Sequence, residues 1–138
     1  MNKRSLMWSL ALVACVAACA SVPVEVMRGD TDCYSFTALN ADIGKSTFSA
    51  SGMRATADTN CPKITSVHVD VFDDANGNGI WDQGEKRYAF SEGLADPPST
   101  SVTTGSLSGG KNTQSGGTTW HATITNENGG KTSHGGTF

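Results

Sequence analysis

The chain has 138 residues, with 10 Lys and Arg against 13 Asp and Glu, and only 7% of its residues are aromatic. This length fits one domain with a small core. An acidic chain with dispersed lysines lacks the basic surface that nucleic-acid binding requires, and it contains no basic amphipathic helix for a membrane surface. We therefore expect no nucleic-acid partner, and any membrane contact must come from a lipid anchor.

Residues 1–18 have the pattern of an export signal. Lys3 and Arg4 supply the positive charge, and an apolar stretch follows from Leu6 to Ala18. The uninterrupted apolar run is too short to span a bilayer comfortably. We therefore predict that this segment is a signal peptide, removed on export, which leaves 8 basic and 13 acidic residues in the mature chain.

The residues around Cys19 predict how the signal is removed. Val16-Ala-Ala-Cys19 resembles the lipobox of bacterial lipoproteins, which implies that Cys19 is the lipidated first residue of the mature protein. A second match, ending at Cys15, leaves a very short signal. Ordinary cleavage after Ala20 also stays open, because Ala18-Cys-Ala20 is an A-x-A site.

Localisation follows from these alternatives. No acidic retention signal follows Cys19, so we expect an exported lipoprotein of the cell envelope, anchored in the outer membrane. With ordinary cleavage, the protein is instead periplasmic or secreted and soluble.

Two cysteines remain after the signal region. Cys33 and Cys61 form an even pair in an oxidising compartment, which predicts a disulfide bond. In the chain-entropy model a bond that closes a loop of this length contributes roughly 3–4 kcal/mol.

The rest of the chain predicts one β domain. Residues 19–32 form a tether in this interpretation, and residues 33–138 form a single domain. Beyond the signal, no window has helical periodicity, whereas period-2 alternation recurs between Gly, Asn and Pro turns. The pattern predicts an all-β fold, a small β-sandwich of about seven strands. Strand-like stretches are residues 33–37, 47–57, 65–72, 86–91, 101–107, 118–125 and 131–138, and the expected core is Tyr34, Phe36, Phe48, Val67, Val69, Val71, Tyr88, Phe90, Trp120 and Ile124.

One stretch carries a strong chemical signal. Residues 74–85 read DANGNGIWDQGE and fill every fixed position of the calcium-loop pattern D-x-[DN]-x-[DN]-G-x₅-E. Ca²⁺ prefers 6–8 oxygen ligands, which alternate residues of a curled loop supply. A polar Asn-Gly hairpin turn is the alternative. The expected Ca²⁺ ligands are Asp74, Asn76, Asn78, the Ile80 carbonyl, Asp82 and Glu85.

The flanks of this EF-hand-like loop are strands, where an EF-hand has helices. The stretch VFDDANGNGIWDQGE resembles the calcium loops of bacterial surface proteins with Cna-B or serine–aspartate-repeat B-type domains. The resemblance covers residues 67–90. It implies an Ig-like or prealbumin-like sandwich in which the loop binds Ca²⁺ and stiffens the module. A dockerin needs two such loops, and this chain has one.

Trp81 stands at loop position 8, where EF-hands usually carry an aliphatic residue. We consider two roles for it: a lid packed on the sandwich, or an exposed platform for a sugar or protein partner. The catalytic alternatives are weaker. The three histidines lack metal-ligand spacing, and the serines lack a G-x-S-x-G elbow.

Three classes of function remain. The leading hypothesis is a calcium-binding envelope lipoprotein, not an enzyme, which acts as a structural or interaction module for an unknown protein or glycan partner. The second is a carbohydrate- or ligand-binding module, which needs a row of exposed aromatics such as Trp81, Trp120 or Tyr34. An envelope enzyme is the least favoured, because the sequence offers no convergent titratable groups away from the loop.

Overall fold

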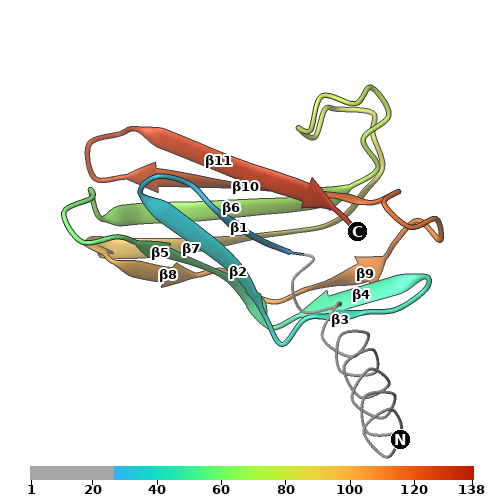
Figure 1. The fold of residues 1–138 in the computed structure, drawn as a ribbon, viewed down its shortest axis with the longest axis horizontal. Coiled ribbons are helices and arrows are strands. Elements are labelled where there is room, and N and C mark those ends of the chain that lie inside the picture. Colours follow the sequence, from blue (N-terminus) through green and yellow to red (C-terminus); the bar gives the residue numbers. More distant parts are fainter. Residues whose placement is uncertain (1–26) are drawn as a thin grey trace, which may run out of the picture.

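The computed structural model describes residues 27–138, and these residues contain strands and no helix (Figure 1). The predicted signal peptide 1–18, Cys19 and most of the expected tether lie outside the described residues. No helix that could cross a membrane occurs in the described part of the chain. The strands are β1 (Arg28–Asp30), β2 (Tyr34–Leu39), β3 (Asp42–Ile43), β4 (Thr47–Ala50), β5 (Gly52–Ala57), β6 (Ile64–Phe72), β7 (Arg87–Ser99), β8 (Ser101–Thr103), β9 (Leu107–Gly110), β10 (Thr119–Asn126) and β11 (Lys131–Thr137).

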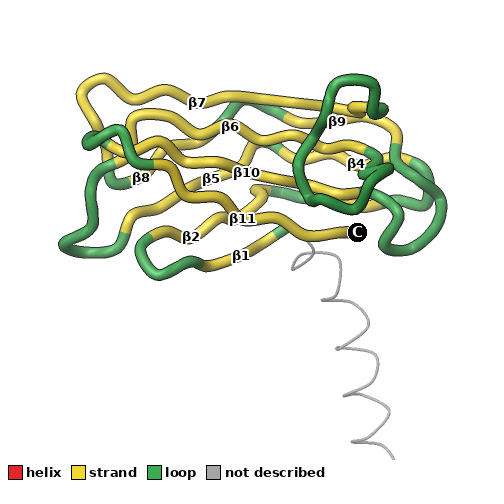
Figure 2. Tube along the Cα trace, turned by 90° about the horizontal axis from the view of Figure 1, so that it is seen from above, coloured by secondary structure: helices red, strands yellow, loops and turns green. Residues whose placement is uncertain are grey.

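These strands form three antiparallel sheets, as expected for a small β-sandwich. One four-stranded sheet has the order β1-β2-β5-β8, and the other has the order β11-β10-β6-β7. A smaller sheet, β3-β4-β9, extends one end of the molecule (Figures 1 and 2). The buried side chains of all three sheets form one continuous hydrophobic core. The all-β prediction is confirmed.

The centre of the core comes from β6 and β10. Buried hydrophobic residues alternate with polar ones over residues 67–71 and 120–124, and each buried valine of β6 lies opposite a buried residue of β10. Pairs of this kind are the unit from which a sheet gains stability. The register pairs Val67 with Ile124, Val69 with Ala122 and Val71 with Trp120.

The structure has more strands than the expected seven because two predicted segments are divided and because β1 and β3 are short strands that the pattern did not indicate. Residues 47–57 form two strands in different sheets, β4 and β5, and the chain passes from one sheet to the other at Ser51. Gly52 follows this crossing. A Cβ there would collide with the Thr104 carbonyl, so glycine permits the close approach of the two segments.

β7 is longer than the pattern indicated. Residues 93–99, expected to be a connection, form its second half. Pairing with β6 shifts between Leu94 and Ser99, so the prolines lie where the ladder is irregular. Proline lacks an N–H and is tolerated in sheets at such irregularities and at edges.

Two expected core residues lie elsewhere. Phe90 is 57% exposed, and Tyr88 is only half-buried. β7 is an edge strand of its sheet, and its Phe90 side is the outer face. Alternation along a strand predicts which residues share a face, but it does not say which face meets the core.

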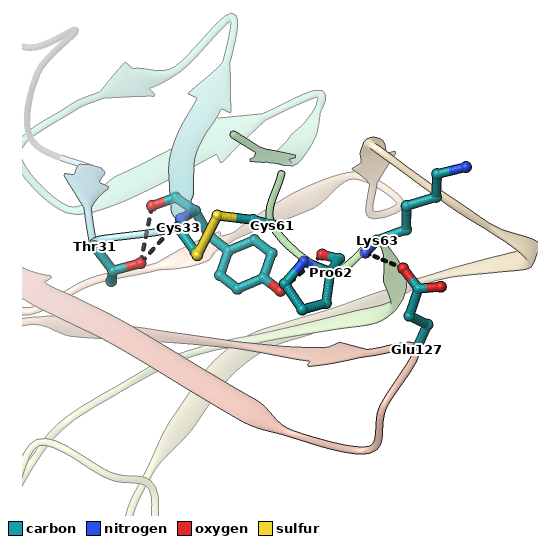
Figure 3. The surroundings of a disulfide bond; sticks show 7 residues. Thr31, Cys33, Cys61, Pro62, Lys63 and Glu127 are labelled. Atoms are coloured by element: carbon teal, nitrogen blue, oxygen red, sulfur yellow. Dashed lines mark hydrogen bonds between the residues drawn. A yellow bond between two sulfur atoms is a disulfide. The ribbon is translucent and has the colours of Figure 1, made fainter. Parts of the chain in front are cut away.

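The Cys33–Cys61 disulfide is present, as predicted (Figure 3). It joins the residue before β2 to the turn that precedes β6. Nearby, the Tyr34 hydroxyl donates to the Pro62 carbonyl at 2.8 Å, and the Lys63 N–H donates to the Glu127 carboxylate. The bridge therefore sits in a network that ties both large sheets together.

The expected tether over residues 19–32 is corrected at its C-terminal end. Residues 28–30 form β1, which pairs with β2, and Met27 is fully buried. The composition of a short charged segment is typical of a linker. When such a segment lies beside an open sheet edge, however, it can pair with that edge as an additional strand.

Candidate metal site in the loop between β6 and β7

The twelve-residue loop lies in the connection between β6 and β7, as the fold prediction placed it. Its neck is closed where the Asp73 N–H donates to the Lys86 carbonyl at 2.9 Å. Figure 1 shows the loop standing out from one end of the sandwich. The strands on either side are paired to each other up to Phe72 and Arg87, so the loop leaves from a rigid base.

The first half of the loop curls through side-chain acceptors. Asp74 Oδ2 accepts the Gly79 N–H at 2.7 Å. Asn76 Oδ1 accepts the Asn78 N–H at 3.2 Å, and Asn78 Oδ1 accepts the Ile80 N–H at 3.0 Å. Gly79, at loop position 6, has a φ of +77°, a conformation that favours glycine. These bonds turn the backbone around the side chains at positions 1, 3 and 5.

The second half closes the loop through carboxylates. Glu85 accepts the Ala75 N–H through Oε2 at 2.7 Å and the Asp82 N–H through Oε1 at 2.8 Å. Asp82 Oδ2 accepts the Nδ2 groups of Asn76 and Asn78 at 2.9 and 2.7 Å. Glu85 thus connects the beginning and end of the loop, and the Asp82 carboxylate binds the side chains of both asparagines.

The five predicted ligand side chains therefore take part in one hydrogen-bonded loop. Ile80, whose backbone carbonyl is the sixth predicted ligand, has a side chain that is 52% exposed. The Oδ1 atoms of Asp74 and of Asp73, which lies just outside the loop, are both buried and have no hydrogen-bond partner. In residues 27–138 no group of three or more His, Cys, Asp or Glu side chains is placed to hold a metal ion. Any site here must therefore combine carboxylates with asparagine and backbone oxygens.

Trp81 is half-buried, and its side chain makes two polar contacts. Its indole Nε1–H donates to the Glu85 carbonyl at 3.1 Å, and the Arg87 guanidinium lies 4.1 Å from the ring centroid. The aromatic row that a sugar platform requires does not form with the residues named above. Trp120 and Tyr34 are only 1% and 3% exposed and belong to the core.

A polar cluster on the outer face of β6 and β7 was not anticipated. His68 contacts Asp70 at 2.8 Å and Glu92 at 3.0 Å through its two ring nitrogens. Arg87 contacts Asp70 at 3.2 Å, and its guanidinium also lies 4.1 Å from the Phe90 ring. The spacing of His68 and Asp70 on one strand was visible in the sequence, but their partners on β7 depend on strand register.

Burial shifts the pKa of two side chains near the loop. Burial raises the pKa of Tyr88 above 10.0, and its 2.9 Å hydrogen bond to Asp73 raises it further. Burial lowers the pKa of His121 below 6.5, although the Asp70 carboxylate opposes this shift. At neutral pH both groups are therefore uncharged.

Together these features define an all-β, disulfide-bonded module with one EF-hand-like loop. No protein-family model and no curated protein matches the chain. Among solved structures it is similar to OgpA from Akkermansia muciniphila, at 10% identity and a TM-score of 0.41 over 86% of this chain. The polysaccharide deacetylase BC0361 from Bacillus cereus has 13% identity and a TM-score of 0.32 over 76% of this chain. β-Glucosidase 3B from Thermotoga neapolitana has 14% identity and a TM-score of 0.32, also over 76%.

The chain spans 30%, 29% and 16% of the length of those three proteins. At these TM-scores the similarity identifies neither a family nor a function.

Proposed function

We propose that this protein is a calcium-binding, exported lipoprotein of the bacterial cell envelope that acts as a structural or interaction module. The loop of residues 74–85 carries the proposal. It matches the calcium-loop pattern at every fixed position, and Asp74, its first residue, has a buried carboxylate oxygen without a hydrogen-bond partner. An unpartnered buried carboxylate oxygen is costly unless it meets a donor or a cation.

The donor set of the loop fits Ca²⁺. It contains carboxylates, amide oxygens and a backbone carbonyl, which are hard oxygen donors. The amide oxygens of Asn76 and Asn78 each accept one backbone N–H and, like any carbonyl oxygen, have a second lone pair available. The residues that would hold the ion are Asp74, Asn76, Asn78, Ile80 through its carbonyl, Asp82 and Glu85.

A bound Ca²⁺ would neutralise the carboxylates of the loop and stiffen it. Three carboxylates within twelve residues repel one another, and a divalent cation removes that repulsion. Because the loop joins two core strands, β6 and β7, the effect would reach the sandwich. We therefore infer a structural role for the ion in a module that binds a protein or glycan partner.

Calcium is expected to raise the melting temperature of the protein. At a Ca²⁺ concentration ten times the dissociation constant, binding adds roughly 1.4 kcal/mol to the free energy of unfolding. For a domain of this size that corresponds to about 4–8 °C. Melting curves with millimolar Ca²⁺ and with chelator measure the shift, and calorimetry measures the binding heat.

Magnesium is the matched control for this experiment. Mg²⁺ needs a tighter octahedron and dehydrates reluctantly, so it should give a smaller shift than Ca²⁺ at equal concentration. Identical melting curves with Ca²⁺ and chelator, together with no binding heat, would show that the loop is only a polar turn.

Export and anchoring rest on separate observations. The disulfide between Cys33 and Cys61 is typical of an oxidising compartment outside the cytosol. The lipobox Val16–Cys19 supports acylation of Cys19, and a periplasmic or secreted soluble form is the alternative.

Intact-mass analysis of protein extracted from the envelope is expected to show a mature chain that begins at an acylated Cys19. The mass should also lack two hydrogens, because Cys33 and Cys61 are bridged. A Cys19→Ser variant should lose the lipid and leave the membrane fraction. A chain that begins at Ser21 without lipid would contradict the anchor and favour a soluble protein.

We propose no enzymatic role. Of the three histidines, His68 has both ring nitrogens in contact with carboxylates, so neither nitrogen is available as a general base. His134 is half-buried and stacks against Phe36, and it lines a cleft beside the loop together with His121.

A further inference from the structure

A cleft of about 570 Å³ lies between the loop and the outer face of β10 and β11. Residues 77–80 and Asp74 form one wall, and residues of β10 and β11 form the other. Figures 1 and 2 both place the loop at the same end of the molecule as the C-terminal end of β11. The volume is in the range of pockets that hold small ligands, about 300–1,000 Å³.

The sheet side of this cleft carries small hydrogen-bonding groups. Thr119 and His121 of β10 alternate with the buried Trp120 and Ala122, so they point away from the core. Ser133 lies on the same outer face, where its hydroxyl contacts that of Thr123 at 2.9 Å. Hydroxyl groups both donate and accept hydrogen bonds, and a neutral imidazole does the same through its two nitrogens.

Glycines line the floor of the cleft. Gly135 and Gly136 present peptide groups without side chains there. A Cβ at Gly135 would lie 3.5 Å from the His121 ring, so glycine leaves space beside that side chain. β11 is also an edge strand of its sheet. A polar ligand can therefore reach the strand backbone as well as the side chains.

The charges of the residues that line the cleft limit which class of ligand can bind there. Among the described residues that line the cleft, none is Lys or Arg, and Asp74 is the one acidic residue. His121 is uncharged at neutral pH because burial lowers its pKa. An anionic ligand would find no cationic partner here, whereas a neutral ligand with many hydroxyls would meet matching groups. Apart from the histidines, the lining contains no aromatic ring, so recognition would proceed by hydrogen bonds.

We propose that this cleft binds one neutral sugar residue of a glycan, with His121 and Ser133 as hydrogen-bonding partners and loop residues 77–80 as the second wall. The inference rests on the proposed function, since the loop that forms this wall is the proposed calcium site. It replaces the aromatic platform considered from the sequence by a polar cleft at a different place on the module.

The test measures binding of free neutral monosaccharides to the protein by saturation-transfer NMR and calorimetry. Glucose, galactose, mannose and N-acetylglucosamine form the panel, and glucuronic acid is the charged comparison. We expect at least one neutral sugar to bind and glucuronic acid to bind more weakly. His121→Ala should reduce affinity about tenfold, the effect of one lost hydrogen bond, and Ser133→Trp should block the cleft.

Thr125→Ala is the control, because Thr125 lies on the same strand as His121 but outside the cleft. It should leave sugar affinity unchanged. The calcium-dependent melting shift is measured on every variant, which separates loss of the sugar site from loss of the loop or the fold. Chelator should weaken sugar binding to the parent protein.

The outcomes separate the two proposals. If Ca²⁺ raises the melting temperature but no neutral sugar binds, the cleft proposal is wrong and the calcium function stands. Sugar binding that survives both His121→Ala and Ser133→Trp would also overturn it, because the sugar would then bind elsewhere. If sugar binds through His121 but Ca²⁺ has no effect on melting or on sugar affinity, the cleft is supported and the calcium function fails.

Discussion

Replacing Glu85 by Gln is expected to weaken Ca²⁺ binding by at least about 100-fold. Mutation of a residue that only hydrogen-bonds to a metal ligand already lowers metal affinity about 10–100-fold. Glu85 is itself the expected bidentate ligand at loop position 12, so its loss should cost more. The substitution removes one charge and one acceptor oxygen. Both carboxylate oxygens are used in the structure, one by the Ala75 N–H and one by the Asp82 N–H.

Lys86→Gln is the control for this experiment, since it also changes one charge and lies next to Glu85 but outside the pattern. Calorimetric Ca²⁺ titration of both variants gives the affinities, and melting curves with chelator show whether the loop is intact without the ion. We expect Lys86→Gln to match the parent. Equal Ca²⁺ affinity for the parent and Glu85→Gln would remove Glu85 from the ligand set.

Removing the disulfide is expected to have the largest effect on stability. The two cysteines are 28 positions apart, and in the chain-entropy model the double variant Cys33→Ala with Cys61→Ala should lose roughly 3–4 kcal/mol. That is a large fraction of the stability of a typical domain, about 5–15 kcal/mol. The bridge also holds Tyr34 near Pro62, so the network between the sheets loses its covalent support. Denaturant unfolding of the variant and the parent measures the difference.

The double variant avoids a free thiol, which a single substitution would leave. Parent protein whose disulfide has been reduced should unfold at the same denaturant concentration as the double variant. If the double variant unfolds at the same denaturant concentration as the parent, the bridge contributes nothing to stability. A loss well above 5 kcal/mol would mean that Ala at these positions also disturbs packing.

The all-β class was predictable because buried strands impose a period of two on the sequence. The alternation in residues 65–72 and 118–125 indicated β6 and β10, and the valines of β6 are fully buried as that pattern requires. The disulfide followed from cysteine number and compartment alone. The position of the loop between two strands followed from the flanking alternation, since all of these signals are local along the chain.

Other features depended on contacts between distant segments. Trp120 and Phe90 both stand in alternating strands, yet Trp120 is buried in the interior while Phe90 lies on the outer face of an edge strand. The recruitment of residues 28–30 as β1 depended on an open edge of β2. Only pairing across strands decides which face is covered, because strand periodicity is the same for both faces.

The candidate site divides in the same way. The amino-acid sequence by itself determined the twelve loop residues, because every position of the pattern lies within one short segment. Tertiary structure alone decided that His121 and Ser133 lie across a cleft from that loop, and that His68 contacts Glu92. These residues are far apart in the chain, and the register of β6 with β7 and of β10 with β11 sets which of them meet.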